Sequence, residues 1–408
     1  MSSAWPIRNL GEVLEIQNGY AFDSKGFNPT EGMPLIRIRS LKTGTETETR
    51  FAGNYDKKYV VNNGDLLIGM DGEFGCYEWK SGAALLNQRV CRLQGFKSDL
   101  LPRFLFYGVN SHLKAIEDVT GFATVKHISS KQISGIKFSL PPLQEQQRIV
   151  AILDQAFEGI AKARANAEQN LQNARALFES HLQSVFSVRG ELVEPQHPST
   201  SSGRADKGWA NNNLVALSDL ATDITDGDHM PPPKAITGVP FITIGNIVKP
   251  TRTIDFTDTF KVPFEYFNKL KANKKPKRGD VLYTVTGSFG IPVLVKDNQE
   301  FCFQRHIGLI RPKSDVSSEW LCYLLGSPQL VKQANDGATG TAQKTVSLKV
   351  LRGFQVPNLP IDKQNKMVVE LDALSKETKR LEAIYHRKIE LLDELKKSLL
   401  QQAFAGEL

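Results

Sequence analysis

Cysteine is scarce in this sequence: only four of the 408 residues are cysteines, and they stand far apart. Cys76, Cys91, Cys302 and Cys322 form no pair at the short spacing that a zinc site or a thiol redox motif requires. We interpret them as isolated thiols, packed among other side chains or lying at the surface. No metal site is predicted.

Long apolar runs are missing as well. No stretch approaches the roughly 18 apolar residues that a membrane-spanning helix needs. The first residues, Met1 to Pro6, lack the charged and apolar regions of a signal peptide. With 40% hydrophobic and 23% charged residues, the composition is typical of folded globular chains. We therefore expect a cytosolic protein.

Motifs for nucleotide and cofactor chemistry are also missing. No glycine-rich loop ends in Lys and Ser or Thr, so ATP hydrolysis by this chain is not expected. Neither a glycine-rich cofactor loop after the first strand nor an Asn/Asp-Pro-Pro-aromatic motif is present, so methyl transfer from its own active site is not expected. The formal net charge of +7 indicates a polyanionic partner, because its excess lies in residues 1–143 and 195–361.

The sequence contains one internal repeat. The offset between matching residues grows from 204 near the N-terminus to a constant 218 after Lys126, so insertions fall in loops. Matching pairs include Gly64-Asp65 with Gly279-Asp280, Gln88-Arg89 with Gln304-Arg305, Lys126 with Lys344, and Gln146 with Gln364. A chain of this length is expected to hold two or more cores. The protein is predicted to be a tandem duplication.

Each copy has two parts. The first contains short apolar or alternating runs, such as 65–68 and 281–285, separated by Gly, Pro and Asn, which predicts a β-rich domain with a few helices. The second is a long helix, because 144–185 holds no proline and its apolar residues advance in steps of four and three. The predicted seam positions are Ile149, Leu153, Ile160, Leu371, Leu374, Leu381, Leu392 and Leu395.

The two long helices are expected to pack on each other antiparallel. A helix of about 40 residues is roughly 60 Å long, too long for one domain to bury along one side. Asn170 and Lys388 occupy equivalent seam positions. They either fix the register of the pair or are tolerated polar residues at a water-exposed position.

Five segments follow from these patterns: a first β-rich domain (1–143), a first long helix (144–190), a polar linker (191–208), a second β-rich domain (209–361) and a second long helix (362–408). The predicted fold class is α+β. Two β-rich mixed domains are separated by a pair of long antiparallel coiled-coil helices, with pseudo-twofold symmetry.

The sequence resembles the DNA specificity subunits of type I restriction-modification systems. The likeness rests on the segment from Leu140 to Ile149 at the domain-helix boundary, on Asp226-Gly227-Asp228-His229 with 238–247 after it, and on the C-terminal 402–408. It covers essentially the whole chain. In the second copy the boundary departs to 359–364, which lacks the first proline and the glutamate.

The resemblance implies a noncatalytic, sequence-specific DNA-binding subunit of a restriction system in the prokaryotic cytoplasm. Each target-recognition domain is expected to read one half of a bipartite target in double-stranded DNA, and the helices to dock two methyltransferase subunits for DNA modification. Whether a restriction and translocation subunit joins them stays open. No cofactor of its own is implied; S-adenosylmethionine, ATP and Mg²⁺ are implied only for the partner subunits.

Candidate DNA-contacting residues lie in glycine-rich loops and at basic positions shared by the copies. They are Gly72, Gly75, Arg89, Lys126, His229, Gly287, Ser288, Gly290, Arg305 and Lys344. Glycine lets the backbone approach a phosphate or makes a tight turn, and an arginine donates to guanine or phosphate or pairs with an internal carboxylate. Phosphate contact is favoured for the two lysines, whereas the basic run 271–278 is read as a solvated loop.

Two alternatives remain open. The first is an autonomous magnesium-dependent endonuclease built on Asp71, Glu78 and Lys80, a pattern that the second copy does not keep. The second is a coiled-coil scaffold that binds proteins and no DNA. Magnesium-dependent cleavage by the isolated chain would support the endonuclease. The scaffold predicts that the chain has no salt-dependent affinity for duplex DNA.

Overall fold

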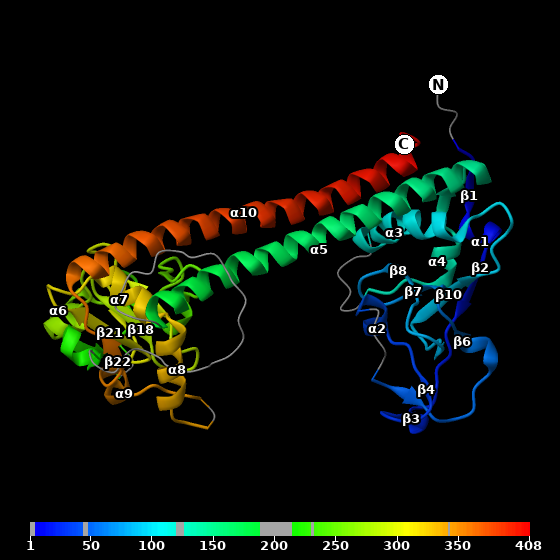
Figure 1. The fold of residues 1–408 in the computed structure, drawn as a ribbon. Coiled ribbons are helices and arrows are strands. Elements are labelled where there is room, and N and C mark those ends of the chain that lie inside the picture. Colours follow the sequence, from blue (N-terminus) through cyan, green and yellow to red (C-terminus); the bar gives the residue numbers. More distant parts are fainter. Residues whose placement is uncertain (1–4, 44–47, 120–125, 188–213, 230–231, 342) are drawn as a thin grey trace, which may run out of the picture. The chain divides into compact units, whose positions relative to one another are not determined.

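The computed structural model describes residues 5–43, 48–119, 126–187, 214–229, 232–341 and 343–408 (Figure 1). The chain divides into two compact units. Unit 1 comprises residues 1–167 and 387–408, and unit 2 comprises residues 168–386. Each unit therefore joins a recognition domain to a segment of each long helix. The predicted linker 191–208 lies outside the described residues.

Unit 1 contains a four-stranded antiparallel sheet in the order β2-β10-β7-β8, and its first strand, β1, pairs with its last, β11. Its strands are β1 (Ile7–Asn9), β2 (Glu15–Asn18), β3 (Phe27–Asn28), β4 (Met33–Pro34), β5 (Arg50–Phe51), β6 (Val60–Val61), β7 (Leu66–Gly69), β8 (Gly75–Glu78), β9 (Ala84–Leu85), β10 (Val90–Gln94) and β11 (Lys137–Ser139). Its domain helices are α1 (Leu10–Val13), α2 (Ile38–Thr43), α3 (Pro102–Val119) and α4 (Ser130–Ser134).

Unit 2 repeats this arrangement. Its four-stranded sheet has the order β13-β21-β18-β19, and β12 pairs with β22. Its strands are β12 (Leu214–Ala216), β13 (Ala221–Asp226), β14 (Val239–Ile242), β15 (Ile247–Val248), β16 (Thr253–Ile254), β17 (Lys261–Val262), β18 (Val281–Thr284), β19 (Pro292–Leu294), β20 (Cys302–Phe303), β21 (Ile307–Pro312) and β22 (Gln355–Pro357). Its domain helices are α6 (Phe264–Lys269), α7 (Ser318–Leu325), α8 (Pro328–Gly337) and α9 (Leu348–Arg352). The matching strand orders confirm the two β-rich domains of the predicted α+β fold.

A buried central strand organises each sheet. Every residue of β7 and of β18 is buried, which explains their near-continuous apolar sequences. A repeated ion pair lies beside them: Arg92 contacts Asp65 at 3.1 Å, and Arg311 holds Asp280 through two nitrogens at 2.9 and 2.7 Å. Asp280 is only 2% exposed, so this pairing satisfies a charge that burial alone would penalise.

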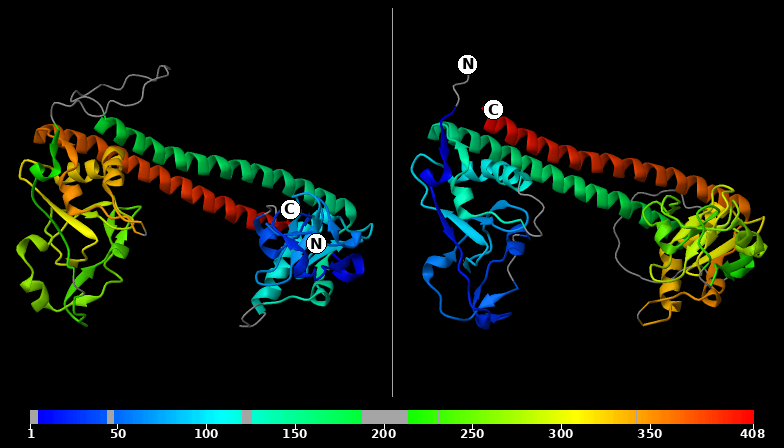
Figure 2. Two further views of the ribbon diagram at one scale, coloured as in Figure 1. Left: turned by 90° about the horizontal axis from the view of Figure 1, so that it is seen from below. Right: turned by 180° about the vertical axis from the view of Figure 1, so that it is seen from behind.

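The two long helices are α5 (Leu143–Ser187) and α10 (Ile361–Ala405), and the views of Figure 2 agree that they lie side by side. In unit 1, Arg148 donates to the carbonyl of Leu408, and Arg164 pairs with Asp393, so the helix segments run antiparallel. In unit 2, Arg175 pairs with Glu382 at 2.9 Å. Gly406 ends α10 in the left-handed conformation (φ +74°), a common helix termination.

The predicted seam residues have different environments. Ile149 and Leu153 are buried in the same cluster as the unit 1 domain core, and Leu371 is buried in the unit 2 core. Four other seam residues are partly buried: Ile160, Leu374, Leu381 and Leu392. Leu395 is 47% exposed, so it is not buried between the helices. Asn170 and Lys388 are exposed, which favours the interpretation of tolerated polar residues.

A buried glutamine fixes the junction between domain and helix in each unit. In unit 1, Gln146 accepts from the N–H of Leu101 at 2.8 Å and donates to the carbonyls of Asp99 (2.7 Å) and Pro141 (2.9 Å). In unit 2, Gln364 has the same role, contacting Ser317, Asp315 and Leu359 at 2.8, 3.3 and 2.7 Å. Both glutamines are at most 1% exposed. Each side chain satisfies three backbone groups at the start of a long helix.

Replacing this glutamine is expected to destabilise its own unit. Gln146→Ala leaves three backbone groups without a partner, so the free energy of unfolding should fall by about 3 kcal/mol. Thermal unfolding and hydrogen exchange across residues 97–103 measure the effect. Gln147→Ala, at an exposed position on the same helical turn, is the matched control. Equal stability of the two variants would contradict the role assigned to Gln146.

Candidate nucleic-acid interface

Three of the predicted basic and glycine positions meet at one edge of unit 1. The N–H of Gly72, in the turn after β7, donates to the carbonyl of Lys126 at 2.9 Å. The N–H of Met70 donates to the carbonyl of Arg89 at 2.8 Å, and the N–H of Ile128 donates to the carbonyl of Met70 at 2.9 Å. The turn after β7, the turn before β10 and the segment before α4 are therefore joined by backbone hydrogen bonds.

Unit 2 brings its counterparts together in the same way. The N–H of Gly287 donates to the carbonyl of Lys344 at 3.0 Å. The N–H of Val285 donates to the carbonyl of His306 at 2.9 Å, and the N–H of Val346 donates to the carbonyl of Val285 at 2.8 Å. Gly72 and Gly287 both adopt positive φ, +77° and +69°, which their turns require. The two recognition domains thus carry equivalent three-segment edges.

The structure pairs Arg89 with a different residue of unit 2 than the sequence repeat does. The carbonyl of Arg89 accepts from the N–H of the residue after β7. In unit 2 the carbonyl that accepts from the residue after β18 is that of His306, not that of Arg305. Arg305 consequently occupies the place of Gln88. Burial, followed by the charge of Arg305, lowers the pKa of His306 below its ordinary value. The Gln-Arg identity of the two copies suggested the other pairing, and only the hydrogen bonds reveal the shift.

The remaining candidates differ in accessibility. His229 lies beside this edge in unit 2: its Nε2 is 2.8 Å from a carboxylate oxygen of Asp226, and its side chain is 61% exposed. The exposed Ser288 accepts from the ammonium of Lys249 at 2.8 Å. Gly290 is partly buried, and Gly75 is buried beneath the ring of Tyr77. Gly75 therefore serves hairpin packing, not close approach of a ligand.

The two candidate lysines are held differently. The ammonium of Lys126 donates to the carbonyl of Glu117 at 2.9 Å. A hydrogen bond from Lys114 is the main cause that lowers the pKa of Glu117, which also accepts from the N–H of Phe74. Lys126 thus has an internal structural contact, and the loop before it, 120–125, lies outside the described residues. Lys344 is exposed.

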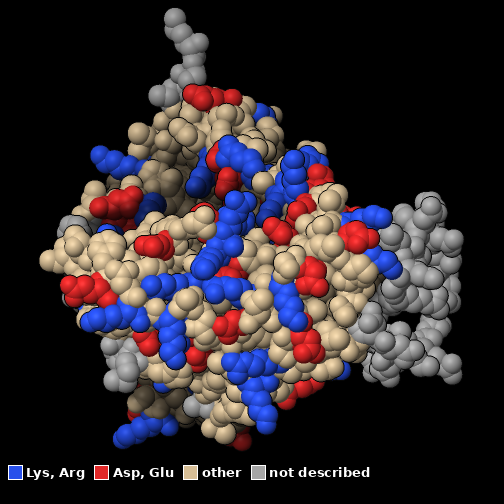
Figure 3. All heavy atoms as spheres, turned by 90° about the vertical axis from the view of Figure 1, so that its left-hand side faces the viewer, with Lys and Arg blue, Asp and Glu red and all other residues tan. Residues whose placement is uncertain are grey.

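The basic run 271–278 in unit 2 is partly tied to its own domain. Lys274 donates to the carbonyl of Gly227 at 3.1 Å, and Lys275 donates to that of Asn268 while lying 4.7 Å from the ring centre of Phe267. On the face of unit 2 in Figure 3, Lys and Arg side chains are interspersed with Asp and Glu. Basic side chains on this face therefore have acidic side chains among them.

The structure does not assemble the nuclease-like cluster. Gly69 pairs with Gly75 at the turn end of the β7–β8 hairpin, whereas Glu78 pairs with Leu66 at the other end. Asp71 belongs to the turn, so Glu78 is about 10 Å further along the hairpin, at about 3.3 Å per residue. The endonuclease hypothesis is therefore wrong in its proposed residues.

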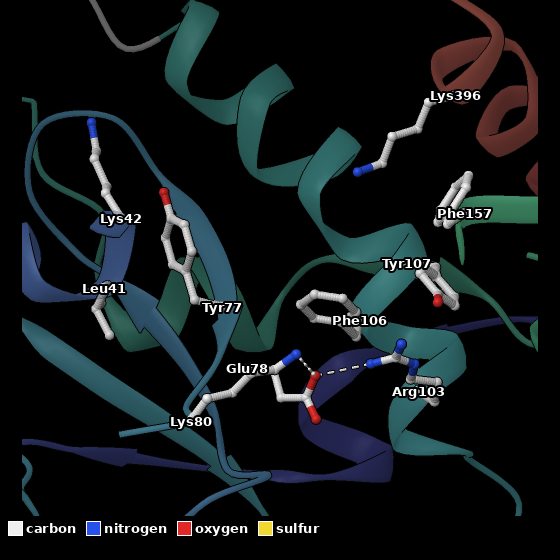
Figure 4. A pocket seen from close by; sticks show the side chains of 10 residues that line it. All are labelled: Leu41, Lys42, Tyr77, Glu78, Lys80, Arg103, Phe106, Tyr107, Phe157 and Lys396. Carbon is white, nitrogen blue, oxygen red and sulfur yellow. Dashed lines mark hydrogen bonds and ion pairs between the residues drawn. The ribbon is translucent and has the colours of Figure 1, made fainter. Parts of the chain in front are cut away.

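Of that cluster only Glu78 and Lys80 meet, and both acidic residues also pair with side chains outside it. Glu78 lies between Arg103 (2.9 Å) and Lys80 (3.3 Å) in a hollow that is also lined by Phe106 and Tyr107 (Figure 4). Asp71 contacts His127 and Arg89. Within the described ranges, no group of three or more His, Cys, Asp and Glu side chains is placed to hold a metal ion.

The cysteines behave as packed thiols. Cys76, Cys91 and Cys302 are buried and Cys322 is partly buried, and all four are free thiols. Burial raises the pKa of Cys91 and of Cys302 to about 12 and that of Cys322 to about 11. Such thiols stay protonated near neutral pH and are poor nucleophiles.

Among the described residues, no helix combines the length and apolar character needed to cross a membrane.

Comparison with known proteins identifies the repeat. The model of the type I restriction modification DNA specificity domain matches residues 2–169 and again residues 220–391. The chain is 28% identical over 415 residues to the type I restriction enzyme EcoBI specificity subunit of Escherichia coli, covering 99% of this chain and 86% of that protein. It is 21% identical to the EcoKI specificity subunit of Escherichia coli, with coverage of 100% and 90%.

Solved structures share the fold. A chain from a structure described as the basis of complex assembly and conformational transition of the type I R-M system superposes with a TM-score of 0.72, at 20% identity, covering 100% of this chain and 99% of that one. The HsdS subunit from Thermoanaerobacter tengcongensis gives a TM-score of 0.55 at 20% identity, with coverage of 100% and 98%. With both copies of the domain matched, this chain belongs to the family of type I restriction-modification specificity subunits, the noncatalytic subunits that give these systems their DNA specificity.

Proposed function

We propose that each recognition domain binds one half of a bipartite target in duplex DNA through its three-segment edge. The observation that carries this proposal is the same set of backbone hydrogen bonds in both units, which gathers Gly72, Arg89 and Lys126 in one and Gly287, His306 and Lys344 in the other. The exposed Arg89 and the partly buried His306 can donate to base edges, and turn glycines admit a phosphate close to the backbone.

The long helices are proposed to hold two methyltransferase subunits. Apolar side chains that face solvent on them support this: Leu177, Val369 and Ile384 in unit 2, and Leu391 and Leu395 in unit 1, are 44–69% exposed. Leu391 and Leu395 are four residues apart and so share one face of α10. A partner that covers these side chains removes apolar surface from water. S-adenosylmethionine and ATP would then be bound by partner subunits.

Single-molecule methylation sequencing tests this function. Host DNA is compared with and without this chain while its methyltransferase partner is expressed. We expect a split motif, two short specified halves around an unspecified gap, to lose methylation when the chain is absent. An unchanged methylome, with the partner shown to be active when it is paired with another specificity subunit, would contradict the proposal.

A further inference from the structure

A charged cluster at the edge of unit 1 has the geometry of a base-reading group. One carboxylate oxygen of Asp71 lies 2.6 Å from Nδ1 of His127, and the other lies 3.5 Å from Nε of Arg89. Nη1 of Arg89 is also 3.5 Å from Nδ1 of His127. Asp71 therefore restrains both side chains, one with each oxygen.

Arg89 is held in an unusual backbone conformation. Its φ of +71° is in the left-handed region, which only one other non-glycine residue of the described chain, Arg252, adopts. An arginine is not needed to make such a turn, since glycine makes it without strain. The side chain is 57% exposed, whereas that of its partner Asp71 is 23% exposed. Arg89 therefore combines a strained backbone conformation with an exposed guanidinium. Strained backbone of this kind is concentrated at functional sites.

The guanidinium borders a concave surface that carries several polar side chains together with Met70 and Gly19. A hollow of about 300 Å³ is lined by Arg89, Gln88, His127, Asn18, Ser129 and Ser130. Since Nε of Arg89 is directed to Asp71 and one hydrogen of Nη1 to His127, the second hydrogen of Nη1 and the amino group of Nη2 are the donors available to a ligand. Two parallel donors match the O6 and N7 acceptors of guanine in the major groove, and no other base presents that pair of acceptors there.

The second unit carries different chemistry at the same three positions. The isolated bridge between Asp71 and His127 corresponds to a bridge between Thr286 and Thr345, and Arg89 corresponds to His306. Thr345 Oγ1 lies 3.4 Å from Thr286 Oγ1. One structural framework therefore holds Asp, Arg and His side chains in unit 1 and two Thr side chains with one His in unit 2, as expected if the two halves of the target differ in base sequence.

We propose that Arg89 reads a guanine in the half-target bound by unit 1, and that Asp71 is the positioning residue that aims it. This inference rests on the proposed function, because it assigns a specificity residue to the edge proposed to bind DNA. A purely structural role for Arg89 makes a different prediction: replacing it by glycine would relax the turn and leave the target unchanged.

The test compares methylation motifs of the wild-type complex and an Arg89→Gly complex, each assembled with its methyltransferase. We expect Arg89→Gly to accept other bases at one guanine position, with discrimination reduced about 10-fold to 100-fold, while the other half of the motif is unchanged. Asp71→Asn should relax the same position to a smaller degree, and Asp71→Glu should restore part of the preference. The thermal unfolding temperature of Arg89→Gly should not fall.

Lys97→Ala is the matched control. Lys97 is an exposed lysine of the same unit outside this hollow, so its loss removes one positive charge and should leave the motif unchanged. An unchanged motif in Arg89→Gly, with a split motif in the wild type, overturns this inference alone. Absence of any split motif in the wild type overturns the proposed function as well. If Arg89→Gly abolishes methylation altogether, Arg89→Asn decides, because asparagine tolerates the left-handed backbone and carries no guanidinium: relaxation at one guanine supports the inference, and an intact motif overturns it.

Discussion

The double variant Leu153→Asp with Leu371→Asp is expected to unfold both units and abolish methylation. Both leucines are 0% exposed, and each belongs to the hydrophobic cluster of its recognition domain. Loss of a buried leucine costs about 2–5 kcal/mol, and a carboxylate buried without a partner adds to that cost. Each unit carries one such change, and its cost approaches the lower end of the whole stability of a typical domain, about 5–15 kcal/mol.

The heptad pattern alone supports a different expectation for this variant. If these leucines only joined the helices, the variant would separate them and leave the recognition domains folded. Because the two leucines pack among residues of the domain cores, we expect the variant to lose both the helix pairing and the folded recognition domains. Circular dichroism and limited proteolysis measure the outcome, and domains that survive while methylation is lost would show that the seam acts independently of the domain cores.

The double variant Leu391→Asp with Leu395→Asp changes two exposed leucines of a long helix instead of two buried ones. Both leucines are 47% exposed, so carboxylates there meet water and the unfolding temperature should change little. If these side chains contact a methyltransferase, the variant complex should dissociate in size-exclusion chromatography. A folded variant that still forms the complete complex would remove this face of α10 from the proposed docking surface.

The repeat made the architecture predictable. Once the copies were aligned, the two β-rich domains, the two long helices and the repeated Gln146 and Gln364 followed from spacing alone, because the core positions of a duplicated fold keep the same neighbours. The long helices were clear for another reason: a proline-free heptad pattern has few other structural solutions.

The candidate site was predictable only in part. Arg89 was identified from a shared Gln-Arg pair, yet its structural counterpart is His306, since a turn can shift register by one residue without leaving a gap in the sequence. Asp71 was grouped with Glu78 only in the alternative endonuclease hypothesis. The two residues are close in sequence, but the hairpin places Asp71 at its turn and Glu78 at its other end. His127 was missed. Its bond to Asp71 joins residues 56 apart, and no local pattern signals such a contact.

Exchanging residues 1–142 for the recognition domain of another specificity subunit is expected to change only one half of the DNA target. The half read by unit 2 should stay the same, because its edge is built from residues 285–346 alone. Methylation sequencing of the chimeric complex measures both halves at once. The reciprocal exchange of residues 214–360, which should change the other half, is the matched control.

The exchange requires that the donor domain fits the contacts that α5 and α10 make within unit 1. Gln146 needs a backbone donor and acceptor at the places of Leu101 and Asp99, and the ring centre of Phe404 in α10 lies 4.9 Å from that of Phe104, with the two rings tilted. A donor that carries these groups should fold on the recipient helices. If such a chimera is folded and active but both halves of the motif change, the domains do not read independently, and the base preference of each would depend on the other. A change confined to one half would instead assign each half-target to one unit.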